Sequence, residues 1–319
     1  MLFNRPRGPN RGSEVKDSNG LQAHLASLFE LGRHPLRFAS AEQTIRMDRC
    51  EMQRQNFADA AGNPVSGWLC RPEGPGPHPA VLVVHAHGGR YDIGARELVE
   101  GRPALGAPLG PELARAGLVA LCLDLPCFGD RAARETEGAA AKAALWRGGS
   151  LAGRMLGELQ AQLDWLCADP RVDAARVGVF GLSMGATLGT WLAAADPRVR
   201  ALAQLVCLAD IDALIATGAH DLHGIYLTVP GLLRIASTGA IAGLVAPRPQ
   251  LVGIGDLDPL TPPAAADIAL AELRAAYAAA GADAALRVIR DPAAGHEVTP
   301  AMRAATLELF VRALGQGAR

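Results

Sequence analysis

The chain has 319 residues, of which 50% are hydrophobic and 20% are charged, and its formal net charge is -1. This length fits one large α/β domain with extensions or two smaller domains. The near-neutral charge argues against nucleic acid or an anionic membrane as the main partner, because no cationic excess exists to displace counterions. The sequence contains no run of about 18 apolar residues, so a membrane span is not predicted.

The first ten residues combine charged and turn-forming types and lack the apolar core of a secretory signal. The six cysteines show neither CxxC nor another metal-ligand spacing, and several stand in apolar contexts, so we expect reduced, buried thiols. These features predict a cytoplasmic protein. The cysteines are Cys50, Cys70, Cys122, Cys127, Cys167 and Cys207.

The N-terminal part of the chain is predicted to hold little of the main fold. Residues 1 to about 20 are expected to form a loose tail, because they are rich in Arg, Gly, Asn and Ser. Residues 21–31 carry leucines at helical spacing and predict a short helix. Residues 44–59 and 64–71 are interpreted as two strands, paired antiparallel across the turn at 61–63.

From residue 80 onward, short apolar runs alternate with helical patterns. The expected strands are 80–85, 118–124, the run ending at Phe180, 201–207, 249–254 and 285–289. The expected helices are 111–116, one marked by Leu156 to Leu166, 186–193, one closing at Gly281, and one beginning at Thr299-Pro300. This alternation predicts a parallel sheet covered on both faces, with right-handed crossovers. The irregular stretch 209–245 is expected to be an insertion over the sheet edge or a lid.

The sequence around Ser183 has the strongest functional signal. Gly181, Ser183 and Gly185 form a G-x-S-x-G pattern between an apolar strand and a helix. In this setting the serine occupies a sharp, strained turn that exposes its hydroxyl, and the small neighbours allow close packing. The context therefore indicates a nucleophilic serine.

A serine hydroxyl needs a base and an orienting acid to act as a nucleophile. Ligands of open α/β sheets bind at the carboxyl ends of strands, so the partners are expected in loops directly after strands. One such loop contains Asp256 and Asp258, and a later one contains His296. The chain order Ser, Asp, His is that of α/β-hydrolases. We favour Asp258 over Asp256 as the acid, and both stay open.

Beyond the elbow, several motifs make the chain resemble an α/β-hydrolase of the dienelactone-hydrolase and acetyl-xylan-esterase-like branch. They are His85-Ala86-His87-Gly88-Gly89, the segment 124–131, Gly181 to Gly185, Ala246-Pro247-Arg248-Pro249, Gly255 to Pro262, and Gly295-His296. The resemblance implies a mostly parallel eight-stranded sheet with helices on both faces. It implies residues 1–40 as an N-terminal extension and 41–319 as the hydrolase domain, with an insertion at about 209–245.

The resemblance also implies where an oxyanion would be held. One donor is expected to be the amide of Met184, directly after the nucleophile, and the second the amide of His87 or Gly88. The dienelactone hydrolases proper use cysteine at the elbow. The serine in this chain therefore favours ester hydrolysis, with carbohydrate acetates or other small carboxylic esters as substrates.

Other residues compete for these roles. His85 and His87 precede the elbow and are expected to shape the oxyanion loop. His220 and His223 could line a lid or substrate pocket, or be ordinary loop histidines. Asp124 and Asp210 also follow strands and are alternative acids.

No cofactor or metal is predicted. The glycine pairs match neither a Walker A loop nor G-x-G-x-x-G, and His85-x-His87 lacks a third ligand at usable spacing. The predicted partner is a small-molecule ester, and the sequence carries no information on oligomeric state. A serine peptidase or amidase on the same fold is the alternative function. A non-catalytic binding protein is a further one.

Overall fold

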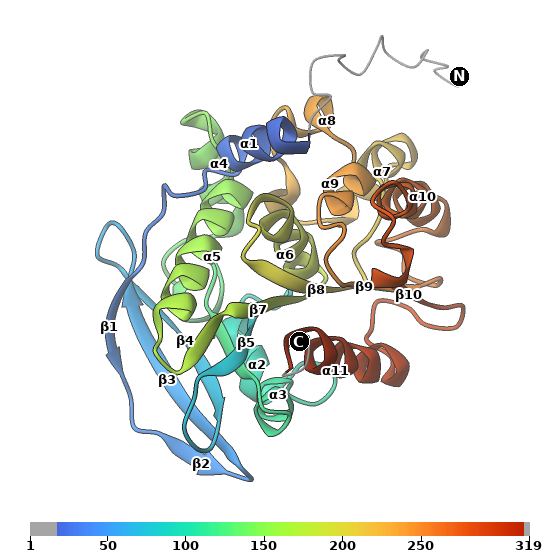
Figure 1. The fold of residues 1–319 in the computed structure, drawn as a ribbon. Coiled ribbons are helices and arrows are strands. Elements are labelled where there is room, and N and C mark those ends of the chain that lie inside the picture. Colours follow the sequence, from blue (N-terminus) through green and yellow to red (C-terminus); the bar gives the residue numbers. More distant parts are fainter. Residues whose placement is uncertain (1–17, 316–319) are drawn as a thin grey trace.

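The computed structural model describes residues 18–315, so the predicted tail falls almost entirely outside the described residues. Its centre is one ten-stranded sheet with helices on both faces (Figure 1). The strands are β1 (Arg37–Ala41), β2 (Ile45–Met47), β3 (Cys50–Ala58), β4 (Pro64–Pro72), β5 (His78–Val84), β6 (Val119–Leu123), β7 (Val172–Leu182), β8 (Val199–Leu205), β9 (Gln250–Gly255) and β10 (Leu286–Asp291).

Helices of very different lengths connect the strands. The α-helices are α1 (Ser18–Leu28), α2 (Glu97–Glu100), α3 (Gly110–Arg115), α4 (Glu137–Trp146), α5 (Leu151–Ala168), α6 (Met184–Ala195), α7 (Ile211–Thr217), α8 (Leu232–Ile235), α9 (Thr238–Gly243), α10 (Pro263–Ala279) and α11 (Pro300–Leu314). Short 3₁₀ turns include η2 (Gly129–Arg131), η3 (Ala219–Leu222) and η4 (Ile225–Leu227). Within residues 18–315, no helix combines the length and apolar character needed to cross a bilayer.

The strand order is β1-β3-β4-β6-β5-β7-β8-β9-β10, with β2 paired to β3. Neighbouring strands run parallel along β6-β5-β7-β8-β9-β10. The pairs β1 with β3, β2 with β3, β3 with β4 and β4 with β6 are antiparallel. The predicted α/β-hydrolase architecture is confirmed, but the predicted count of eight strands is wrong. β3 to β10 supply eight strands, and β1 and β2 extend the antiparallel edge.

The error in strand count has a local cause. The segment 44–59 was expected to be one strand, but Asp48 and Arg49 adopt φ of 48° and 61° and form a turn between β2 and β3. Left-handed backbone at two successive non-glycine residues is uncommon, and although Asp is enriched there as a single residue, Arg is not. β1 is only five residues long and exposed throughout, so it lacks an apolar alternation that would mark it.

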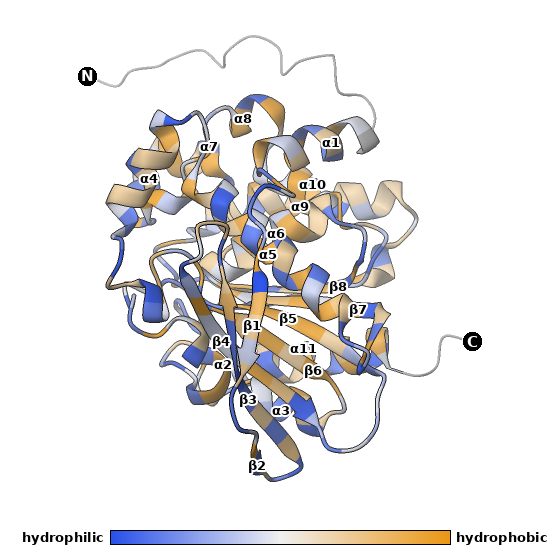
Figure 2. Cartoon of the chain, turned by 90° about the vertical axis from the view of Figure 1, so that its left-hand side faces the viewer, coloured by the Kyte–Doolittle hydropathy of each residue, from blue (hydrophilic) through white to orange (hydrophobic). Residues whose placement is uncertain are grey.

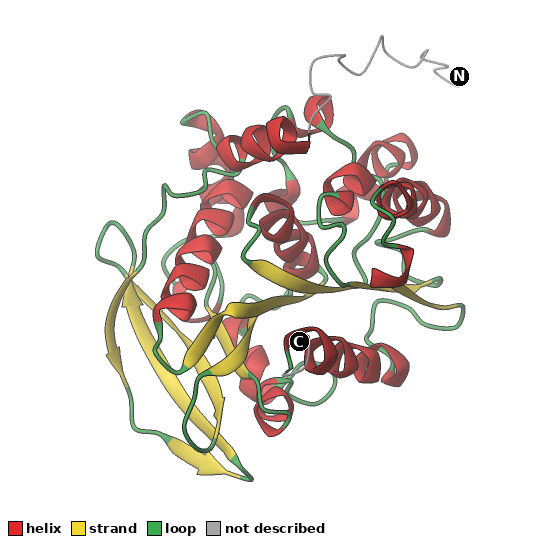
Figure 3. Ribbon diagram, in the orientation of Figure 1, coloured by secondary structure: helices red, strands yellow, loops and turns green. Residues whose placement is uncertain are grey.

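The central strands are buried on both faces, as their unbroken apolar character predicts. Successive residues of β5 enter opposite layers. Leu82 and Val84 pack in the layer with α1, α5 and α6, while Val81 and Val83 pack in the layer with α3 and α11. The strands β5 to β8 accordingly form the most hydrophobic part of the cartoon in Figure 2, and the two helical layers flank them in Figure 3.

The N-terminal helix α1 packs onto this core. Leu25 and Phe29 are fully buried, and the Phe29 ring stacks on Trp191 of α6 with centroids 5.0 Å apart. The described part of the segment 1–40 therefore shares the main core rather than standing apart from it.

The segment 209–245 is helical and has two parts. Its last helix, α9, lies against α6 and α10, and Ile241 and Ala242 are buried there. The preceding residues, 211–235, carry α7, η3, η4 and α8 and are more exposed. We call residues 211–235 the cap.

An ion pair inside the molecule fixes the loop after β6. Arg131 of η2 is 2% exposed, and its Nη2 donates to Glu158 Oε1 of α5 at 2.9 Å. Its Nη1 also donates to the Asp124 carbonyl oxygen at 3.1 Å. Asp130, the neighbour of Arg131 in the chain, contacts Arg54.

Replacing Glu158 with Ala is expected to lower the free energy of unfolding by about 3–5 kcal/mol, because the buried guanidinium would lose the carboxylate to which it donates and keep only the more distant Asp59. Urea denaturation monitored by circular dichroism measures this loss. The control Glu308→Ala removes surface ion pairs with Arg287 and Arg312 and is expected to cost no more than about 1 kcal/mol. Equal losses in the two variants would contradict the prediction.

Candidate active site

Ser183 stands at the turn between β7 and α6 with φ 56° and ψ -121°. This region of backbone space is sparsely populated for a residue with a side chain. The flanking glycines make the turn possible, since a Cβ at Gly181 would overlap the carbonyl of Gly185, and one at Gly185 would overlap that of Val84. Ser183 remains partly exposed although Met184 and Gly185 are buried.

His296 connects the serine to a buried carboxylate. The Oγ of Ser183 lies 2.8 Å from His296 Nε2, and His296 Nδ1 lies 2.7 Å from Asp258 Oδ2. The carboxylate can only accept, so Nδ1 carries the proton and Nε2 is free to accept from the serine hydroxyl. The three side chains come from the elbow, the loop after β9 and the loop after β10, as the chain order predicts.

The surroundings of Asp258 keep it ionised. Burial opposes ionisation, but hydrogen bonds from His296, from the Leu260 amide at 2.9 Å and from the Thr261 hydroxyl at 2.9 Å outweigh it. Together they hold the pKa of Asp258 below its usual value. A charged acceptor at this position stabilises an imidazolium on His296.

The alternative acids lie elsewhere. Asp256 forms an ion pair with Arg290. Asp124 accepts from the amides of Ala95 and Asp130, and Asp210 caps the N-terminus of α7. Of these candidates, Asp258 is the one whose hydrogen bond to His296 the structure records.

The loop after β5 is built on buried polar groups. His85 is completely buried, its Nε2 accepts from the Leu125 amide at 3.1 Å, and burial lowers its pKa to about 3. Glu97 accepts from the Ala86 amide at 2.9 Å and pairs with Arg102 at 2.6 Å. Because His85 is neutral and committed to the backbone, it supports this loop and is not a base.

His87 is held in one tautomer. Its Nδ1 accepts from the Gly89 amide at 3.0 Å, so its Nε2 carries the proton and donates to Glu137 Oε2 at 2.9 Å. Glu137 also accepts from the Tyr91 hydroxyl at 2.6 Å and from the Tyr226 amide at 2.9 Å. Burial acts to raise the pKa of Glu137, but these hydrogen bonds outweigh it and lower the pKa.

Glu137 therefore joins three parts of the structure: the loop after β5, the start of α4, and the cap.

Met184 completes the surroundings of the serine, since it begins α6. The first amides of a helix lack partners within the helix and lie at its positive end.

These groups enclose a cavity of about 340 Å³. We call it the catalytic chamber. It is lined by His87, Gly88, Gly89, Tyr91, Glu137, Ser183, Leu222, His223, Gly224, Tyr226, Leu260 and His296. The chamber brings Ser183 and His296 together with His87 and Gly88, the residues that the sequence analysis assigned to an oxyanion loop.

The two cap histidines differ in position. His223 lines the catalytic chamber, and its Nε2 donates to the Leu260 carbonyl at 3.0 Å. Burial lowers the pKa of His223, which favours this neutral, bonded form. His220 is exposed and lines a separate cavity in the cap.

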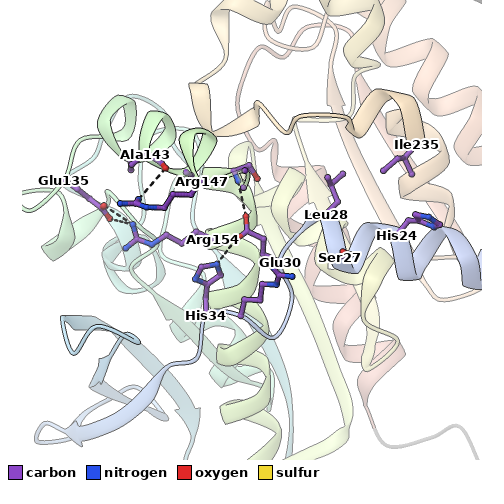
Figure 4. A pocket seen from close by; sticks show the side chains of 16 residues that line it. His24, Ser27, Leu28, Glu30, His34, Glu135, Ala143, Arg147, Arg154 and Ile235 are labelled. Carbon is purple, nitrogen blue, oxygen red and sulfur yellow. Dashed lines mark hydrogen bonds and ion pairs between the residues drawn. The ribbon is translucent and has the colours of Figure 1, made fainter.

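A larger cavity, of about 610 Å³, lies away from the serine between α1, α4 and the start of α5 (Figure 4). Its charged side chains largely satisfy one another: Arg154 pairs with Glu135, and Glu30 contacts His34 and the Ser150 amide. Size alone therefore does not identify the site.

Sequence reasoning missed Glu137, Tyr91 and Tyr226. Glu137 and Tyr226 come from segments without a strand-end position or motif, whereas Tyr91 lies in the loop after β5, just beyond the His85 to Gly89 motif. The three side chains meet only in three dimensions. The signal that was available is weak: Glu137 follows Thr136, which caps α4, and an acidic residue in a first helical turn is common.

Known proteins resemble this chain in sequence. Residues 65–207 match the family model described as the dienelactone hydrolase family. YtaP of Bacillus subtilis (strain 168), which carries the general name of a hydrolase, is 39% identical over 229 residues, or 72% of this chain and 76% of its own length.

Two solved esterases share the fold. An acetyl xylan esterase from Paenibacillus sp. R4 superposes with a TM-score of 0.64 at 20% identity, covering 96% of this chain and 97% of its own. Acetyl xylan esterase 1 from Thermoanaerobacterium sp. JW/SL YS485 gives a TM-score of 0.61 at 17% identity, covering 93% of each chain. At such low identity these similarities establish the α/β-hydrolase fold.

The predicted enzyme class, a carboxylic ester hydrolase, agrees with the family match and with the hydrolase relative. The chain belongs to the dienelactone hydrolase family.

Proposed function

We propose that this protein is a serine esterase that cleaves small carboxylic esters, acetates among them, through Ser183, His296 and Asp258. The observation that carries the proposal is the continuous hydrogen-bonded series from the Ser183 hydroxyl through His296 to the buried Asp258. The serine hydroxyl is also accessible from the catalytic chamber.

In the proposed mechanism, His296 Nε2 takes the Ser183 proton while Oγ attacks the ester carbonyl carbon. The resulting oxyanion accepts hydrogen bonds from the amides of Met184 and of His87 or Gly88. Collapse breaks the bond to the alkoxy oxygen, which leaves with the proton from His296. Water, deprotonated by His296, then attacks the acyl-enzyme, and Ser183 regains a proton as the carboxylic acid departs.

The size and lining of the chamber support a small acyl group. Its volume of about 340 Å³ is at the lower end of the range for ligand pockets. His87, Tyr91, Glu137 and Tyr226 line it, so long acyl chains would meet polar and aromatic groups. The acetyl xylan esterases that share the fold act on acetylated substrates by name, which is consistent with this choice.

All six cysteines are free thiols, which supports a cytoplasmic location as part of the proposal.

Replacing Ser183 with Ala is expected to lower kcat for p-nitrophenyl acetate by roughly 10⁴- to 10⁶-fold, because the nucleophile is lost. Thermal unfolding should show an intact fold, and a fluorophosphonate probe should label the parent protein but not the variant. Turnover that survives in the variant would reject the assignment.

Replacing Asp258 with Asn is expected to lower kcat by roughly 10⁴-fold, because an amide donor at this position favours the wrong tautomer of His296. The matched control is Asp256→Asn, two residues earlier, which removes an ion pair with Arg290 and should stay within a few-fold of the parent. Steady-state kinetics on the same ester compares the two. The reverse ranking would assign the acid to Asp256.

Replacing Glu137 with Gln is expected to lower kcat by roughly 10- to 100-fold with little change in KM, because His87 would lose the charged acceptor that fixes the oxyanion loop. Affinity for a boronic acid, which mimics the tetrahedral state, should fall in parallel with kcat. Glu135→Gln, which changes a more exposed carboxylate near the same helix, is the control. A loss confined to KM would contradict this role.

A further inference from the structure

A second cavity, of about 440 Å³, lies inside the cap. We call it the cap cavity. Seven of its lining residues are aliphatic: Ile211, Ile215, Ile225, Leu227, Val229, Leu232 and Leu233. The others are His220, Asp221, His223, Gly224 and Thr228.

The cap cavity and the catalytic chamber have a common wall. His223 and Gly224 line both, Ile225 and Leu227 of η4 line the cap cavity, and Tyr226 lines the chamber. Gly224 packs closely against the chamber side of this wall, since an added Cβ would lie 2.9 Å from His87 Nε2 and 2.6 Å from Glu137 Oε1. A substrate bound at Ser183 therefore has the cap cavity as its immediate neighbour.

The wall contacts the acid-bearing loop through His223, and it contacts His87 and Glu137 through Gly224. His223 donates to the carbonyl of Leu260, two residues beyond Asp258 in the loop that orients His296. During acylation His296 delivers its proton to the departing alkoxy oxygen, so the alcohol portion of the ester must face the imidazole. The portion of the ester that extends toward His223 is consequently the alcohol rather than the acyl group.

We propose that the cap cavity is the alcohol-side subsite, and that it takes the apolar alkyl or aryl group of a short-acyl ester. This inference rests on the proposed function. It assigns the acyl group to the catalytic chamber and the leaving alcohol to the aliphatic cavity.

The exposed aliphatic surface supports an apolar, uncharged occupant. Ile215 and Ile225 line the cavity yet remain 48% and 37% exposed, and Leu222 at the edge of the chamber is 58% exposed. Covering such surface with a ligand removes it from water, which is favourable in proportion to the apolar area. Asp221, an exposed lining residue, disfavours an anionic alcohol group.

The first test compares acetate esters that differ only in the alcohol: methyl, butyl and hexyl acetate, with acetate release as the readout. For the parent protein, kcat/KM should rise by roughly two- to fourfold per methylene from methyl to hexyl. The ester 2-methoxyethyl acetate has nearly the shape of butyl acetate but replaces one methylene with oxygen. It should be cleaved more slowly than butyl acetate, although its alcohol is the better leaving group.

The second test fills the cavity. Ile215→Trp on α7 should lower the ratio of kcat/KM for hexyl over methyl acetate at least about tenfold. Ile268→Trp is the matched control, because Ile268 is also a half-exposed helical isoleucine (47%) but lines neither cavity. This control should leave the ratio unchanged.

The outcomes separate this inference from the proposed function. Equal kcat/KM along the alcohol series, a preference for the ether-containing ester, or equal effects of the two tryptophan variants would overturn the alcohol-side subsite while acetate cleavage dependent on Ser183 persists. Failure of the parent protein to cleave any of these acetates, or activity that survives in Ser183→Ala, would instead overturn the proposed function.

Discussion

The strained turn at Ser183 is the constraint on which the rest of the site depends. A non-glycine residue in a sparsely populated backbone region costs of order 1–3 kcal/mol and persists only where its surroundings enforce it. Here β7 pairs on both sides within the sheet, and α6 packs against β7 and β8. The close approach of Gly185 to the backbone of Val84 brings the start of α6 against the end of β5. Ser183 and the loop after β5 are therefore placed relative to each other by backbone contact.

Around this turn, buried carboxylates take the place of regular secondary structure in fixing loops. Glu97 holds the Ala86 amide, Asp124 holds the amides of Ala95 and Asp130, and Glu137 holds His87 and the Tyr226 amide. Burial raises the pKa of Glu97 to about 7 and that of Asp124 to about 6, whereas hydrogen bonds lower the pKa of Glu137. Glu137 is the one of the three that faces the chamber, where a permanent negative charge keeps His87 in a single tautomer.

The sequence predicted most of the sheet and the parts of the site that carry a local signature. The elbow, the Asp-containing loop and His296 each follow an apolar strand, so their shared edge could be expected from topology alone. The choice between Asp256 and Asp258 could not, because both stand in the same loop and the decision depends on which side chain turns inward: Asp258 is 1% exposed, whereas Asp256 reaches outward to Arg290. β2 was missed because the turn at Asp48 and Arg49 lies inside what reads as one strand, and β1 was missed because it is short and exposed throughout.

The cap was the part least accessible to sequence reasoning, because its organisation comes from contacts with distant segments. Tyr226 bonds to Glu137 and His223 bonds to Leu260, which fastens the segment 223–226 both to α4 and to the loop after β9. With its middle held in this way, the cap presents polar and aromatic groups to the serine and aliphatic groups to the cap cavity. An ester spanning the two would place its polar carbonyl among hydrogen-bond donors and its hydrocarbon among isoleucines and leucines. Selectivity would then depend on the cap, while the bond-breaking chemistry would depend on the sheet.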